Sequence, residues 1–139
     1  MPTHRSGIKV LGDAVYALLN VAGFTALSTG GVYNDVPQGT ALPYTMFGNF
    51  IETRWDSMGQ PGKQITFDVH VVSQFEGDKE ATEIASKAIE LLHYQRPTVS
   101  GHTCVVIQYE QTVMFEELVN GILTRHHVAM FRALLDQTL

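Results

Sequence analysis

The residue types best able to do chemistry stand together at Arg125, His126 and His127. Imidazoles are common metal ligands and carry protons near neutral pH. Neighbouring residues of a strand point to opposite faces, however, so His126 and His127 cannot readily share one metal ion. No Cys, Asp or Glu stands near them at ligand spacing. We therefore interpret both as packed or solvated strand histidines and expect no metal site.

A second pair, Asp68 and His70, is separated by one residue, which places both side chains on the same face of a strand. The two could interact, but neither a nucleophile nor a third orienting group accompanies them. The glycines at 30–31 and 59–62 match neither the Walker pattern nor the dinucleotide-binding pattern. We expect no catalytic residue and no cofactor.

Another group has the composition of a protein interface. Trp, Met and Arg are enriched at interfaces, and all three occur in a turn between two predicted strands. The candidate interface consists of Arg54, Trp55, Asp56, Met58 and Lys63. The alternative is that Trp55 folds back as a lid on the core, and the sequence favours neither interpretation.

Two helices and two hairpins must position these residues. Apolar spacing of three and four predicts a helix near 7–20 and another that follows Asp78 and ends before Pro97. The predicted strands are Tyr44–Trp55 (bent at Gly48), a strand in which Ile65, Phe67, Val69 and Val71 share one face, Val105–Phe115 and Ile122–Phe131. Asn120-Gly121 predicts the turn of the second hairpin, and Ala133–Leu139 is expected to be a short tail.

This order predicts an α+β fold. A four-stranded antiparallel sheet would be covered on one face by two helices, giving a two-layer sandwich of order α-β-β-α-β-β. The length suits a single domain, 1–139, with its core at about 8–133. In this arrangement Val113 and Phe115 continue the apolar side of their strand.

Composition excludes several functions. The chain has 9 Lys and Arg against 14 Asp and Glu, a net charge of −5, and no basic cluster for binding nucleic acid. No apolar run approaches the roughly 18 residues of a membrane helix, and the N-terminus lacks a signal-peptide core. The one cysteine, Cys104, is expected to be a small buried hydrophobe. These features favour a cytoplasmic protein without a membrane or sequence-specific nucleic-acid partner.

One motif points to a known family. The segment Gly31–Gly39, GVYNDVPQG, followed by Ala41–Tyr44, ALPY, resembles the signature of phage tail-completion proteins. This family includes the tail-terminator and tail-to-head joining proteins of long-tailed phages. The resemblance covers roughly residues 8–133, including a first helix with Asp13–Leu19, a second with Ala81–Leu92 and a final hairpin at Val105–Phe131. The long tip at Glu52–Lys63 and the C-terminal tail depart from the family pattern.

The resemblance implies a structural, non-enzymatic role in the virion. Family members form a ring, commonly hexameric, at the head-proximal end of the tail. Such a ring stops growth of the tail tube and contacts the tube protein and the head-completion or connector protein. The protein would assemble in the host cytoplasm, and DNA could pass through the ring.

Two other functions remain open at this point. The first is a small cytoplasmic ligand-binding protein or enzyme on a ferredoxin-like sheet, with Asp68, His70 or His126 in a pocket. The second is an adaptor that docks a partner through the tip around Trp55.

Overall fold

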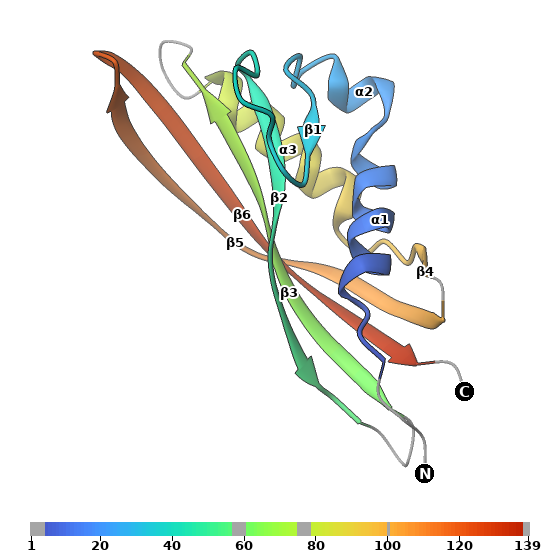
Figure 1. The fold of residues 1–139 in the computed structure, drawn as a ribbon. Helices are drawn as coiled ribbons and strands as arrows, with labels where there is room; N and C mark the ends of the chain where they lie inside the picture. Colours follow the sequence, from blue (N-terminus) through green and yellow to red (C-terminus); the bar gives the residue numbers. More distant parts are fainter. Residues whose placement is uncertain (1–4, 57–60, 75–78, 100, 138–139) are drawn as a thin grey trace.

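The computed structural model describes residues 5–56, 61–74, 79–99 and 101–137. The elements follow in chain order: α1 (Ile8–Leu19), α2 (Ala22–Thr25), β1 (Val32–Tyr33), β2 (Tyr44–Arg54), β3 (Gly62–Ser73), α3 (Lys79–Leu92), β4 (Thr98–Val99), β5 (His102–Val119) and β6 (Ile122–Gln137) (Figure 1). The two longest strands, β5 and β6, have 18 and 16 residues and extend past their neighbours at one end of the molecule.

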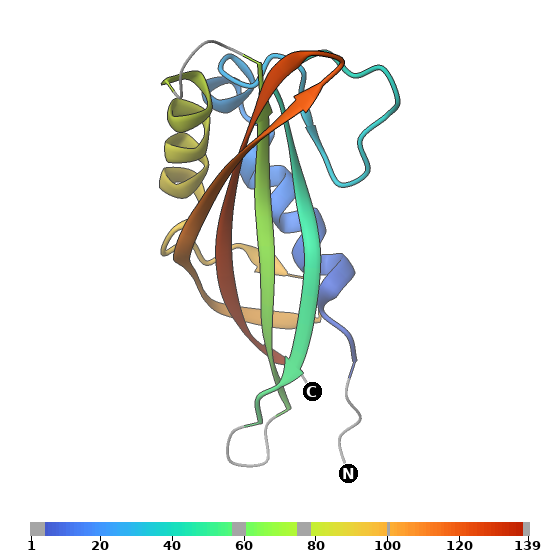
Figure 2. The ribbon, with the colours of Figure 1, turned by 90° about the vertical axis from the view of Figure 1, so that its left-hand side faces the viewer.

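The strands form one mixed sheet in the order β1-β2-β3-β6-β5-β4. β1 runs parallel to β2, and the other neighbouring strands pair antiparallel. The sheet twists strongly and curls into a half-barrel, with the helices on one side (Figures 1 and 2). The predicted four-stranded antiparallel sheet with two helices is therefore wrong, because the described residues form six strands and three helices.

The elements that the sequence missed are very short. α2 has four residues, and β4 has two. Two to four residues cannot show a helical or strand period, so hydrophobic patterning does not detect them. Val32–Tyr33 is equally short, and the structure pairs it with β2 as a parallel edge strand.

The core lies between the helices and the inner face of the sheet, meaning the face that the helices cover. The alternation predicted for β3 is confirmed: its odd-numbered apolar residues are buried inside, and Gln64, Thr66, Asp68 and His70 lie on the outer face. Both long helices contribute their apolar stripes. The buried helical residues are Leu11, Ala14, Val15, Leu19, Ala81, Ile84, Ala85, Ala88 and Leu92.

β5 contains the irregularity that overturns part of the predicted pattern. Ile107 faces the core opposite Ala133, but the pairing register shifts between Tyr109 and Gln111. One extra residue reverses which face each following side chain occupies. Val113 and Phe115 therefore lie on the outer face and are exposed, not on the core side as predicted.

The C-terminal segment also differs from the prediction. β6 continues to Gln137 where a short tail was expected after Phe131. Ala133 and Leu135 are fully buried against β3 and β5. Of the helices described, none is both long and apolar enough to span a membrane.

Candidate interaction surfaces

The end of the β5–β6 hairpin projects beyond β3. Pairing between β3 and β6 ends at Ser73 and Arg125, whereas β5 and β6 stay paired to Val119 and Ile122. The predicted Asn-Gly turn closes this hairpin, with both residues at positive φ. We call residues 113–125 the arm; it rises to one end of the molecule in Figure 1.

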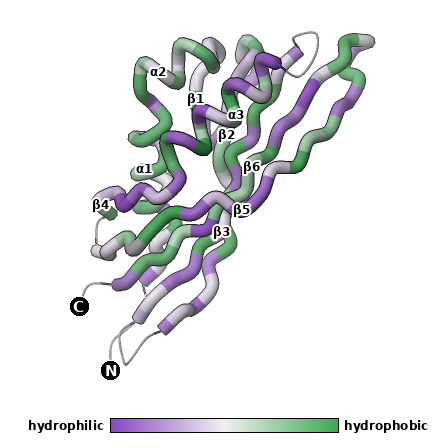
Figure 3. Tube along the Cα trace, turned by 180° about the vertical axis from the view of Figure 1, so that it is seen from behind, coloured by the Kyte–Doolittle hydropathy of each residue, from purple (hydrophilic) through white to green (hydrophobic). Residues whose placement is uncertain are grey.

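Both faces of the arm carry exposed apolar side chains. Strand alternation and the pairing register divide its exposed apolar side chains into an outer set (Val113, Phe115, Val119 and Ile122) and an inner set (Met114, Leu118 and Leu123). Leu118 is 72% exposed, and hydrophobic positions alternate with hydrophilic ones along the arm in Figure 3. Exposed apolar side chains gathered on both faces of a hairpin make the arm a candidate interaction surface.

The acidic residues of the arm have partners within the chain. Glu116 pairs with Arg125 on the inner face, and Glu117 lies 2.7 Å from His126 Nε2 on the outer face. The arm therefore presents apolar side chains whose neighbouring charges already have partners.

A histidine pair anchors the base of the arm. His70 Nε2 and His126 Nδ1 are 2.7 Å apart and share a hydrogen bond. The ring of Phe115 stacks on His126, with centroids 4.5 Å apart and planes 5° apart. Burial lowers the pKa of His70, and the adjacent His126 lowers it further, whereas Asp68 and Glu117 act in the opposite direction.

The structure shows both His126 and His127 packed within β6, in line with the interpretation as strand histidines. His126 and His127 lie on opposite faces of β6, as predicted, and His127 is buried on the inner side. Asp68 could interact with His70, and it does so through its charge, which acts to raise the His70 pKa, while its carboxylate accepts a hydrogen bond from Asn49. The sequence did not place Glu117 beside His126. No three His, Cys, Asp or Glu residues in the described ranges are grouped to hold a metal ion.

Cys104 is buried, which confirms the expectation of a small core residue. Burial raises the pKa of its thiol to about 11. The thiolate is the reactive form of cysteine, so this side chain is inert near neutral pH.

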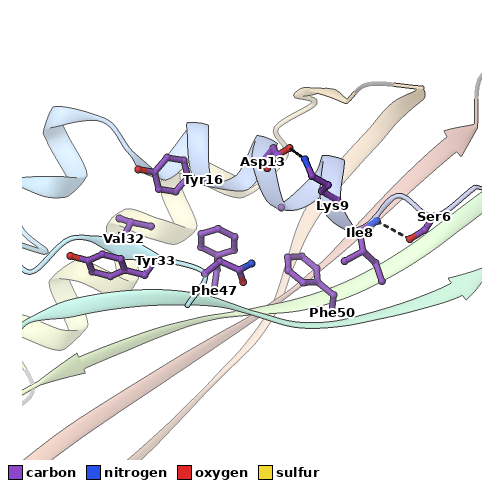
Figure 4. Close-up of a pocket in the computed structure, with 11 residues that line it drawn as sticks. Ser6, Ile8, Lys9, Asp13, Tyr16, Val32, Tyr33, Phe47 and Phe50 are labelled. Carbon is purple, nitrogen blue, oxygen red and sulfur yellow. Dashed lines mark hydrogen bonds and ion pairs between the residues drawn. The ribbon is translucent and has the colours of Figure 1, made fainter. Parts of the chain in front are cut away.

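A groove of about 770 Å³ lies near the other edge of the sheet, between α1, β1 and β2 (Figure 4). Phe47 and Phe50 form its floor, and Tyr16 and Tyr33 stand beside them. Its aromatic lining is continuous, with ring centroids 6.4 Å apart for Tyr16 and Phe47 and 6.5 Å for Phe47 and Phe50. The charged groups at its rim, Lys9 and Asp13, pair with each other at 3.2 Å.

The interface predicted at the β2–β3 tip lies at the end of the sheet remote from the arm (Figure 1). Trp55 is 42% exposed, and the Arg54 guanidinium lies 2.5 Å from the Asp56 carboxylate. Lys63 is only 3% exposed, and its ammonium group donates a hydrogen bond to Gln137. Met58 falls outside the described residues.

Sequence reasoning missed the arm as an interaction surface, although a signal was present. Apolar pairs flank the Asn-Gly turn on both sides, Leu118-Val119 before it and Ile122-Leu123 after it. Consecutive apolar residues beside a tight turn place hydrophobic groups on both faces of a hairpin.

The described residues thus form an exposed apolar arm and an aromatic groove. Residues 13–136 match the family of the tail completion protein gp17. The chain belongs to this family, as its sequence motif indicated, and is a structural component of a bacteriophage-type tail.

Solved structures share the fold. One chain of the virion of a native gene transfer agent (GTA) particle has 21% sequence identity and a TM-score of 0.84, covering 96% of this chain and 99% of that chain. A second solved chain has 15% identity and a TM-score of 0.52, covering 94% of this chain and 96% of that chain. No curated protein sequence matches the chain.

Proposed function

We propose that copies of this chain close into a hexameric ring at the head-proximal end of a phage tail. There the ring terminates the tail tube and joins it to the head-completion or connector protein. Membership of the tail-completion family supports the tail location, and the virion origin of a structure with the same fold is consistent with it. The protein would fold in the host cytoplasm and act in the assembled particle.

The exposed apolar arm is the feature that supports self-assembly. A projecting ribbon with exposed apolar side chains on both faces is typical of a protein interaction surface. Contact with other copies would remove this surface from water, at a gain of about 25 cal/mol for each Å² of apolar area buried. A ring gives every arm an equivalent partner.

The Trp55 tip supplies a second proposed contact. It lies at the opposite end of the long strands from the arm, so a partner there would not compete with the arm. Arg54, Trp55 and Asp56 are accessible for this contact. Lys63 is buried behind them and can support the tip. We propose that this surface contacts an adjoining tail or connector component.

Electron microscopy of tail ends tests the function. Tail tubes assembled without this protein are incubated with the purified full chain. We expect an annulus at one tube end and an arrest of further tube growth. Trp55→Ala is expected to weaken tube attachment and leave the annulus of the protein itself intact. Tubes that lengthen equally with and without the protein, and never carry an annulus, would refute the proposal.

A further inference from the structure

We propose that the arm of one copy seats in the α1–β2 groove of the next copy, forming a head-to-tail contact. This inference rests on the proposed ring and specifies the surfaces that build it. Its components are the apolar arm, residues 113–125, and the groove floored by Phe47 and Phe50.

The two surfaces occupy opposite sides of the same molecule. The groove lies at the β1–β2 edge of the sheet, and the arm leaves from the β6–β5 side. A chain therefore cannot readily place its own arm in its own groove. Each copy therefore has an arm that can insert into a neighbour and a groove that can accept a neighbour's arm.

This arrangement has the geometry that a ring requires. A contact between two identical patches joins two copies and closes on itself, whereas a contact between two different patches repeats from copy to copy. Repetition closes into a ring when the rotation between copies allows it. Separate arm and groove surfaces thus favour a ring over a simple dimer.

The chemistry of the surfaces is complementary. The exposed ends of Met114, Leu118 and Leu123 are aliphatic and adaptable, and the groove offers aromatic faces. The groove volume of about 770 Å³ falls within the roughly 300–1,000 Å³ typical of binding pockets, so it can accept several side chains.

The charged residues beside the arm and the groove are also compatible with a contact between these two surfaces. Copies that each carry a net charge of −5 repel one another at long range, so contact surfaces should not add unbalanced charge. The carboxylates of Glu116 and Glu117 are paired on the arm, and Asp13 is paired with Lys9 at the rim. An apolar contact between these surfaces avoids bringing together two carboxylates that lack partners.

Site-directed cross-linking tests the contact in the full chain, under the conditions in which rings form. Leu118→Cys marks the arm, and Tyr16→Cys marks the exposed wall of the groove. We expect cross-linked dimers in a mixture of the two single variants and none in either variant alone. The double variant should give a ladder that extends to the full ring.

Blocking substitutions provide an independent test. Gly12→Gln fills the groove without strain, because a Cβ at Gly12 would lie 3.6 Å from Phe50, an ordinary contact distance. Leu118→Thr with Leu123→Thr makes one arm face polar. Each variant should reduce self-association at least tenfold in sedimentation. Mixing the two should restore one-to-one pairs, since each supplies the surface that the other lacks. Ile51→Thr, an equally conservative change at an exposed strand residue, is the control.

The outcomes separate this inference from the function proposed above. Rings without arm-to-groove cross-links, or dimers of the Leu118→Cys variant alone, would overturn the head-to-tail contact and leave the ring standing. Absence of rings, both in solution and on tail tubes, would overturn the two proposals together. Unchanged circular dichroism of each variant establishes that a lost contact is not lost folding.

Discussion

Gly30 shows how one residue determines the edge of the groove. Its amide donates a hydrogen bond to the Pro43 carbonyl at 2.7 Å, and the hydroxyl of Tyr33 donates one to the Gly30 carbonyl at 2.7 Å. A Cβ at this position would overlap the carbonyl oxygen of Ala41 and lie 2.6 Å from that of Pro43. Close approach of two backbone segments therefore requires glycine here, and it places β1 beside β2.

Substitution of Gly30 should be costly. Gly30→Ala is expected to lower the free energy of unfolding by about 2–3 kcal/mol, because backbone atoms must move apart. Gly23→Ala is the matched control, since its Cβ would meet only the flexible Lys87 side chain at 3.6 Å. That change should be neutral or stabilise α2 by up to about 1 kcal/mol. Urea unfolding measures both, and equal effects would contradict the close-approach explanation.

At the scale of elements, the arm and the sheet meet at the His70–His126 pair. Three strands contribute, with His70 from β3, His126 from β6, and Phe115 and Glu117 from β5. The hydrogen bond between the two rings needs a neutral acceptor nitrogen, so protonation of both histidines breaks it. This couples the base of the arm to pH.

The lowered pKa of His70 determines whether the free energy of unfolding rises or falls with pH. The unfolded chain binds a proton at His70 near pH 6.5, whereas the folded chain binds it only at lower pH. This contribution to stability is therefore complete above pH 6.5 and is lost as the pH falls through the folded-state pKa. His70→Gln should make the free energy of unfolding less steeply dependent on pH across this range.

Chemical denaturation at several pH values between about pH 7.5 and 5 measures this slope. A steeper slope in the variant, or wild-type stability that rises on acidification, would contradict the assignment.

At the scale of the whole molecule, the long strands separate the interaction surfaces. The arm and the β2–β3 tip lie at opposite ends of the sheet, and the groove lies along one edge (Figures 1 and 4). One rigid, twisted sheet thus presents surfaces in three directions. The proposed ring, with contacts between copies and with components on either side, would use this distribution of surfaces.

The acidic charge of the chain predicts its behaviour toward DNA. With 14 Asp and Glu against 9 Lys and Arg, the chain as a whole should repel phosphates. We expect no binding to duplex DNA in fluorescence anisotropy at about 0.15 M salt. A low-friction passage for DNA through the proposed ring requires this result. Binding with a steep salt dependence would contradict it, because that dependence reports phosphates neutralised by Lys and Arg.

Local patterns in the sequence determined much of the secondary structure and the family. The alternation of β3, the apolar stripes of α1 and α3 and the Asn120-Gly121 turn are all present in the structure. Each depends on residues that are near one another along the chain, where helical and strand periods operate. The motif from Gly31 to Tyr44 is also a local feature of the sequence, and it indicated the tail-completion family.

The tertiary structure alone decided the number of strands, the faces of the arm and the partners of the histidines. A register shift between Tyr109 and Gln111 turned Val113 and Phe115 outward, and no local pattern reveals such a shift. Glu117 reached His126 because two strands paired in one register. Pairing between distant segments depends on the whole fold, so periodicity along the chain does not specify which apolar residues end in the core and which are left for a partner.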